Sequence, residues 1–282
     1  MSYQRISWVA DHLAYVPLVG IVGLGAAAIS KFEIRNSKFG SIVIAALLAA
    51  LAISARQYAG IFQSATALWT YTIKHNPQSW LGYSNLGIEV RAGGRPAEAI
   101  ALYQRALAIR PDDAETHNNL GIALADLGRV QESMDHYEQA LRLRPDFAEV
   151  YGNEGNLLLK TGRVDEAMER FQKALLIDPE LAGVRNELGN ALARQGRIDD
   201  AIVQYREAAR IDPGFVKAEG NLANALSQAG RYAEAIAHFE RVLELDPSSV
   251  VAHYNFGLTL RALGRMDEAR AQWRLAAQLN RH

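Results

Sequence analysis

Asparagine side chains recur at a fixed spacing along most of this chain of 282 residues. A side-chain amide both donates and accepts hydrogen bonds, so amides in a regular row can bind a peptide backbone without reading its side chains. Glu187 replaces asparagine in one segment. One row, spaced by 34 residues, comprises Asn85, Asn119, Asn153, Asn221 and Asn255, and a second row, three residues further on, comprises Asn156, Asn190 and Asn224. These residues are candidates for peptide binding, although the same amides could instead cap or bridge neighbouring helices.

Histidine, cysteine and glycine show no arrangement that would support catalysis or metal binding. His117 and His253 share one position of the repeated pattern, whereas His136 and His238 share another, so no two have metal-ligand spacing on one helix. They are interpreted as scattered surface residues. The lack of cysteine excludes disulfides and thiolate sites, and the glycines do not form the run of a phosphate-binding loop. The sequence therefore predicts no catalytic residue, no metal site and no cofactor.

The elements that must position the asparagines are marked by landmarks with the same spacing. In residues 114–147, Leu120, Leu124 and Leu127 have helical spacing before Gly128, and a second apolar stretch follows and ends at Pro145. Glycine tolerates positive φ at a turn and proline cannot continue a helix, so each segment predicts two helices. The landmarks are Pro77, Pro111, Pro145, Pro179, Pro213 and Pro247; Gly94, Gly128, Gly162, Gly196, Gly230 and Gly264; small residues Ala99, Ser133, Ala167, Ala201, Ala235 and Ala269; and aromatic residues Tyr103, Tyr137, Phe171, Tyr205, Phe239 and Trp273.

This pattern resembles the tetratricopeptide repeat, a helix-turn-helix unit of 34 residues. The resemblance implies an all-α fold, a right-handed superhelical solenoid whose first helices line a concave face. Residues 56–79 are expected to form a connecting helix and half repeat, because Ala65, Trp69 and Pro77 match the small, aromatic and proline positions. Residues 80–282 are expected to form six repeats, with boundaries at 80–113, 114–147, 148–181, 182–215, 216–249 and 250–282.

A few residues depart from the pattern. Glu154 and Phe256 occupy the position of leucine at Leu86. In the last repeat, Arg270 replaces an isoleucine or methionine and Ala277 replaces a leucine, as expected for a terminal repeat that faces water. The array is therefore expected to end at His282, with any missing sequence before Met1.

The first 55 residues differ from the rest. Residues 13–30 and 39–55 carry no charge and are just long enough to span a hydrocarbon core. We interpret residues 1–55 as a membrane segment with two transmembrane helices, a hairpin that contacts the lipid bilayer through residues 13–55. A secretory signal peptide and a pair of buried helices in a soluble protein are the alternatives, and Asp11 together with the second apolar stretch favours the hairpin.

The loop between these stretches indicates an orientation. It carries Lys31, Arg35 and Lys38 against Glu33, and short basic loops stay in the cytoplasm. The expected location is therefore a membrane, such as a bacterial inner membrane, with the repeats on the periplasmic or lumenal side.

Two further resemblances suggest functions. Residues 10–24, ADHLAYVPLVGIVGL, followed by a second span and by LWTYTIKHNP, resemble the end of the membrane part of the transmembrane and tetratricopeptide-repeat protein O-mannosyltransferases. That family uses a lipid-linked sugar, but its catalytic acidic residues lie in an earlier loop, so no catalytic role is carried onto Asp11 or His12. The first asparagine row resembles the asparagine ladder of O-linked N-acetylglucosamine transferase, which holds extended polypeptide substrates.

Composition narrows the class of partner. The net charge of −1 shows no basic bias, so no nucleic-acid partner is expected. The first hypothesis is a membrane-anchored module that binds an extended peptide or a partner protein and is not itself an enzyme. The alternative is the C-terminal, substrate-presenting part of a membrane protein O-glycosyltransferase that lacks its catalytic domain. A scaffold for envelope or secretion complexes is a third possibility, which the sequence does not separate from the first.

Overall fold

The computed structural model describes residues 64–280, and every regular element in that range is an α-helix. The predicted transmembrane helices at 13–30 and 39–55, and residues 56–63 of the predicted connecting segment, lie outside the described residues. Between residues 64 and 280, no helix is both long and apolar enough to cross a lipid bilayer. The chain divides into two compact units, Met1–Pro111 and Asp112–His282, which are described separately.

The described part of the first unit holds three helices. The helix predicted for the half repeat is α3 (Ala65–His75), and it packs against the first helix of the pair α4 (Trp80–Ala92) and α5 (Pro96–Ile109). Serine hydroxyls start two of these helices: Ser64 accepts from Ala67 N–H and Ser79 accepts from Gly82 N–H, each at 3.1 Å. Such caps satisfy backbone donors that the helix itself leaves unpaired.

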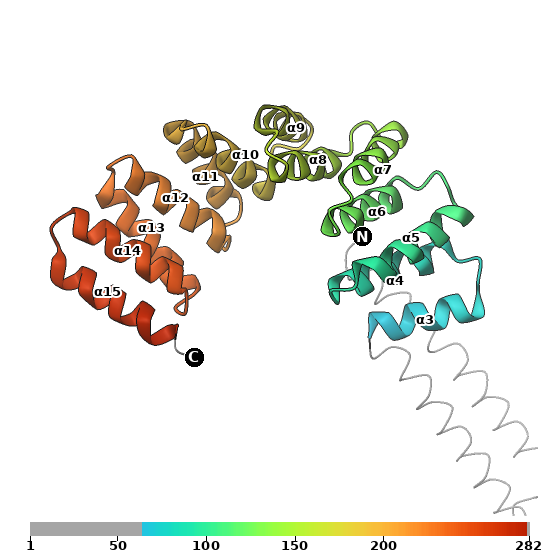
Figure 1. Cartoon of the computed structure of the whole chain (residues 1–282), viewed down its shortest axis with the longest axis horizontal. Helices are drawn as coiled ribbons and strands as arrows, with labels where there is room; N and C mark the ends of the chain where they lie inside the picture. The colour runs from blue at the N-terminus through green and yellow to red at the C-terminus, as the bar shows by residue number, and fades with distance from the viewer. Residues whose placement is uncertain (1–63, 281–282) are drawn as a thin grey trace, which may run out of the picture. The chain divides into compact units, whose positions relative to one another are not determined.

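The second unit consists of five helix pairs in chain order (Figure 1). Each second helix packs on its own first helix and on the first helix of the next pair, and first helices of neighbouring pairs also touch. The pairs are α6 (Ala114–Asp126) with α7 (Val130–Leu143), α8 (Ala148–Lys160) with α9 (Val164–Ile177), α10 (Ala182–Arg194) with α11 (Ile198–Ile211), α12 (Val216–Gln228) with α13 (Tyr232–Leu245), and α14 (Val250–Ala262) with α15 (Met266–Leu279).

The turn within each pair depends on its glycine. Gly128 adopts a φ of 71°, in the left-handed region where a side chain is disfavoured. This conformation turns the chain so that the Arg129 N–H bonds back to the Leu124 carbonyl at 3.0 Å, which satisfies an end carbonyl of α6. The other five predicted turn glycines share the positive φ, so this prediction is confirmed.

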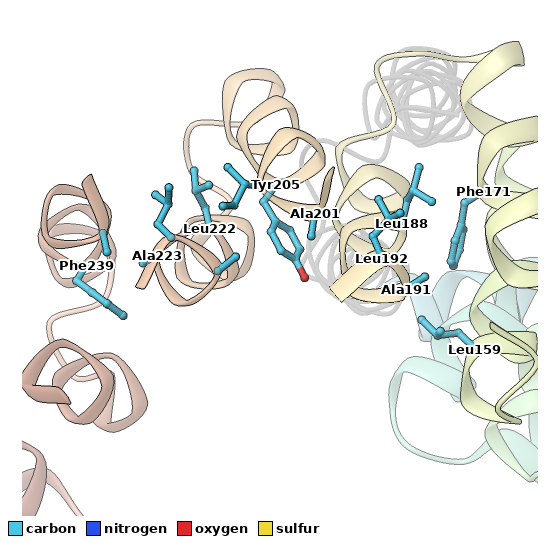
Figure 2. Packing of buried hydrophobic residues seen from close by; sticks show 14 of the residues in the cluster. Leu159, Phe171, Leu188, Ala191, Leu192, Ala201, Tyr205, Leu222, Ala223 and Phe239 are labelled. Carbon is cyan, nitrogen blue, oxygen red and sulfur yellow. The ribbon is translucent and has the colours of Figure 1, made fainter. Parts of the chain in front are cut away.

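Close packing within each pair explains the small and aromatic landmarks. Ser133, at the small position, has no exposed surface, and its hydroxyl donates to the Gly121 carbonyl at 2.7 Å. In a later pair, the Tyr205 ring lies against Gly189, where an added Cβ would sit 2.5 Å from the ring. Figure 2 shows Tyr205 with Ala201 and Leu222 in this core. Large side chains at these contact points would force the paired helices apart.

One charged residue interrupts the core of the second unit. Glu154 occupies the position held by Leu188 in the next repeat and is only 4% exposed. Burial raises the pKa of its carboxyl, and the charge of Arg170, whose Nε lies 3.3 Å from Oε2, acts in the opposite direction. The Glu154 position therefore holds a partly compensated buried charge where its neighbours bury a leucine.

The predicted all-α solenoid of paired helices is confirmed, while its superhelical handedness stays a prediction. An unpredicted feature is an arginine before each second helix that bonds an acidic residue three positions later. In the fourth repeat, Arg197 binds Asp200 at 2.7 Å, and both side chains are more than half exposed. Equivalent pairs are Arg95 with Glu98, Arg129 with Glu132, Arg163 with Glu166, Arg231 with Glu234, and Arg265 with Glu268.

Candidate peptide-binding face

The candidate site is the surface along which the first helices of neighbouring repeats meet in the second unit. On α10, this surface is formed by Gly183, Asn186, Glu187 and Asn190, which have the spacing of one helical face. We call the equivalent surface of α6, α8, α10, α12 and α14 the first-helix face. Its amides are Asn118, Asn119, Asn153, Asn156, Asn186, Asn190, Asn221, Asn224 and Asn255.

Several of these amides bond one another across repeat boundaries. The Asn153 amide nitrogen donates to the Asn118 side-chain oxygen at 2.9 Å, from α8 to α6. Two repeats later, Asn221 donates to Asn186 at 2.8 Å. Asn118 and Asn186 are buried, so these bonds also satisfy polar atoms that have little access to water. The bridging role left open by the sequence is therefore present in the structure.

The last two repeats use a variant of the same bridge. Asn255 on α14 donates to the Asn224 oxygen of α12 at 3.0 Å. Asn221 makes a second contact of this kind, to the Asn190 oxygen at 3.2 Å. Both rows predicted from the sequence thus meet each other at the repeat boundaries.

Glu187, which interrupts the first asparagine row, orients the amides around it. Its carboxylate accepts from the amide nitrogens of Asn186 at 3.1 Å and Asn190 at 2.9 Å. Both asparagines therefore turn their oxygens toward Asn221, and the Asn190 oxygen also accepts from the Tyr205 hydroxyl at 2.8 Å. Burial raises the pKa of Tyr205 to about 12, and the charge of Glu187 adds to this shift.

The bridges leave hydrogen-bonding groups on the face. Each bridging amide donates through its nitrogen, and the side-chain oxygens of Asn153, Asn221 and Asn255 have no partner among residues 64–280. The side chains of Asn119 and Asn156 make no hydrogen bond within the described residues at all. All five are partly buried rather than fully exposed. The face thus presents oriented acceptors on α8, α12 and α14.

The structure does not bring all the predicted residues together. Seven of them lie on the second unit's first-helix face: Asn119 on α6, Asn153 and Asn156 on α8, Asn190 on α10, Asn221 and Asn224 on α12, and Asn255 on α14. The eighth, Asn85, lies on α4 in the first unit, where it is partly buried.

A groove opens on this face between α8 and α10, next to the residue that caps α12. Its volume is about 270 Å³, slightly below the range of roughly 300–1,000 Å³ typical of small-molecule sites. The α8 side contributes Asn153 and Asn156, which are two of the predicted residues. The full lining is Glu149, Gly152, Asn153, Asn156, Leu181, Gly183, Val184, Glu187 and Phe215.

Two histidines interpreted as scattered surface residues form a contact between helices. His117 of α6 and His136 of α7 place their Nδ1 atoms 3.1 Å apart, which requires that one ring donates and the other accepts. Burial, followed by the charge of His117, lowers the pKa of His136. No group of three or more metal-binding side chains occurs within residues 64–280. The two histidines lie on different helices, so their spacing in the sequence does not predict this contact.

Sequence reasoning also missed part of the site. Asn118 and Asn186 sit one position before the predicted row and supply its acceptors. Gly183 stands where other repeats carry the larger residues Leu81, Glu115, Glu149, Lys217 and Val251. Comparing each column of the repeat for an unusually small residue would have identified Gly183, because a missing side chain on an exposed face leaves a hollow.

Comparison with protein families supports the repeat assignment. Four family models match: TPR repeat at residues 89–128 and 155–196, and three models of the tetratricopeptide repeat at 114–147 and 216–249, at 182–215, and at 238–271. These matches do not include residues 10–24, so they give no support to the O-mannosyltransferase resemblance. Among curated proteins, no sequence matches the chain.

Solved structures share the fold. The Pseudomonas aeruginosa protein PilF is 19% identical with a TM-score of 0.63, over 70% of this chain and 89% of that one. PilW, a widely conserved type IV pilus biogenesis factor, is 24% identical with a TM-score of 0.63, over 69% and 90%. MamA from strain MSR-1 is 26% identical with a TM-score of 0.52, over 60% and 97%.

The family models together cover more than half of the chain, at residues 89–147 and 155–271. Their helix-turn-helix repeats coincide with the pairs whose glycine turns and first-helix face are described above. The chain therefore belongs to the tetratricopeptide repeat family, whose repeats bind proteins or peptides.

Proposed function

We propose that the first-helix face of the second unit holds an extended segment of a partner protein, and that the chain has no catalytic activity of its own. The observation that carries the proposal is the row of oriented amide oxygens on Asn153, Asn221 and Asn255. An extended backbone offers N–H donors along its length, and acceptors repeated along a solenoid can bind such donors.

The composition of the face supports a peptide over a cofactor. The groove is small, and among residues 64–280 no cluster of metal-binding side chains occurs. A long, shallow row of amides suits a ligand that makes many weak hydrogen bonds along its length. Side chains between the amides, such as Val251 and Tyr254 on α14, which are 68% and 53% exposed, would then add selectivity.

The test is selection of binding peptides by the full chain in detergent micelles, with a phage library of random dodecapeptides. The double variant Asn119→Ala, Asn156→Ala removes two face amides that make no internal bond, so we expect it to lose enrichment while its melting temperature stays unchanged. The matched control, Gln139→Ala with Gln172→Ala, alters two exposed second-helix residues and should select the same peptides as the wild type. Equal enrichment by both double variants would contradict the proposal.

We also propose that residues 13–30 and 39–55 anchor the chain in a membrane, with the repeats on the periplasmic or lumenal side. The support is their lack of charge and the basic loop between them. Because the chain lacks cysteine, Gln172→Cys provides a single exposed thiol on α9. We expect this thiol to react with a membrane-impermeant maleimide in intact cells. Labelling only after lysis would reverse the orientation, and release of the protein by alkaline carbonate would exclude the anchor.

A further inference from the structure

The groove between α8 and α10 combines apolar walls with negative charge. Leu181, Val184 and Phe215 line it from the α10 and α12 side, while Glu149 and Glu187 supply two carboxylates. None of its nine lining residues is basic. An apolar channel that ends at carboxylates suits a side chain with an aliphatic stem and a cationic head.

The two carboxylates differ in how firmly they are held. Glu187 accepts hydrogen bonds from Asn186 and Asn190, and its Oε1 lies 3.7 Å from the Lys217 ammonium, which does not line the groove. Glu149 is exposed and has no ion-pair partner among the described residues. The groove therefore keeps an excess of negative charge, with one carboxylate fixed and the other free to move toward a ligand.

The groove is accessible because Gly183 lacks a side chain. A Cβ added at Gly183 would meet no atom within 4 Å, so its conformation and packing do not require glycine. Leu81, at the equivalent position of the first repeat, shows that leucine is compatible with this part of the helix. Glycine here opens the space without any visible benefit to folding.

We infer that this groove selects a lysine or arginine side chain of the bound peptide. The inference rests on the proposed function and identifies the type of peptide residue that the groove recognises. The peptide backbone lies along the amides, the basic stem contacts Leu181, Val184 and Phe215, and the cationic head lies between Glu149 and Glu187. The two carboxylates disfavour peptides that carry an acidic residue there, because like charges repel.

The experiment compares peptides selected by the full-length wild type with those selected by Gly183→Leu and by Glu149→Lys, from the same dodecapeptide library. We expect the wild type to enrich lysine or arginine at one shared position. Gly183→Leu should lose that preference, and Glu149→Lys should weaken it or shift it toward acidic residues. The control Glu115→Leu places a leucine at the same helical position two repeats earlier and should keep the wild-type preference.

A synthetic peptide from the selection then isolates the charge. Replacing its basic residue by norleucine keeps the aliphatic stem but removes the cation, and we expect the Kd to rise at least tenfold for the wild type and less than twofold for Gly183→Leu. Equal affinity of the norleucine peptide for the wild type, or selected peptides without a shared basic position, would overturn this inference alone. Failure of the wild type to enrich any peptide would overturn the proposed function and the inference with it.

Discussion

The first-helix faces of α10 and α14 differ although the same framework lies behind them. On α10 this face carries the exposed Gly183 and the buried Asn186, whereas the equivalent positions of α14 carry the exposed Val251 and Tyr254. One surface is hollow and polar, and the other is apolar and protruding. In both helices, however, a glycine packs against an aromatic ring of the partner helix, Gly189 on Tyr205 and Gly257 on Trp273. The repeat thus restricts the residues between paired helices and leaves the other face free to define the ligand.

The largest expected effect distinguishes the face of α10 that packs on α11 from the first-helix face of the same helix. Gly189→Leu forces a side chain into the Tyr205 ring, so we expect it to lower the free energy of unfolding by about 3 kcal/mol or more. Gly183→Leu adds the same side chain into open space on the same helix, where its stability effect should stay within about 0.5 kcal/mol. Urea denaturation of both variants checks this, and similar losses at both positions would break the distinction between framework and face.

The buried charge in α8 gives the next largest effect. Glu154→Leu restores the residue type found at Leu188, so we expect the free energy of unfolding at pH 7 to rise by about 1–2 kcal/mol. Because burial raises the pKa of folded Glu154 above its unfolded value, the wild type gains stability as the pH falls through the folded pKa. The advantage of Glu154→Leu should therefore shrink toward pH 4.5 in a series of denaturation curves. A stability difference that does not vary with pH would contradict the assigned charge.

The amide bridges should have a smaller effect. Asn118→Ala removes the acceptor of Asn153, and we expect it to cost about 1 kcal/mol of stability. Asn156→Ala removes a side chain that makes no internal hydrogen bond, so its melting temperature should match the wild type. Thermal unfolding monitored by circular dichroism compares the two. If Asn156→Ala were the more destabilising, the division of the amides into bridging and binding groups would be wrong.

The smallest effect is expected at the second helices α11 and α15, which share the same exposed ion pair. The pairs Arg197 with Asp200 and Arg265 with Glu268 are both exposed, and such ion pairs contribute little. We expect Arg197→Ala and Arg265→Ala each to leave the free energy of unfolding nearly unchanged. Urea denaturation in low and high salt measures the change in the free energy of unfolding of each variant. A clear, salt-dependent loss of stability would show that the second helices need these pairs.

Most of the fold could be predicted because its determinants are local. The step from Gly128 to Gly162 marks the turns, and the steps from Ala99 to Ser133 and from Tyr103 to Tyr137 mark the helix contacts. Each landmark acts within one helix pair, so its type and spacing carry the information. The asparagine rows also follow the repeat, so the same spacing predicts them.

The rest of the site depends on contacts between neighbouring repeats and could not be predicted from periodicity. Asn153 finds its acceptor on Asn118 only when α8 packs beside α6, and His117 meets His136 only across a helix pair. Glu187 interrupts the row in sequence, yet it orients Asn186 and Asn190 in space. Exceptions to a repeat were therefore more informative about the site than the repeat itself.

The central claim is that the amides of the first-helix face bind the backbone of an extended peptide. Isothermal titration calorimetry of a selected peptide, with each backbone nitrogen methylated in turn, tests it most directly. N-methylation removes a donor without changing any side chain, so we predict that every second methylation in the central part of the peptide raises the Kd at least tenfold, because alternate N–H groups of an extended chain point to the same side. Kd values within twofold of the parent at every position would contradict the claim.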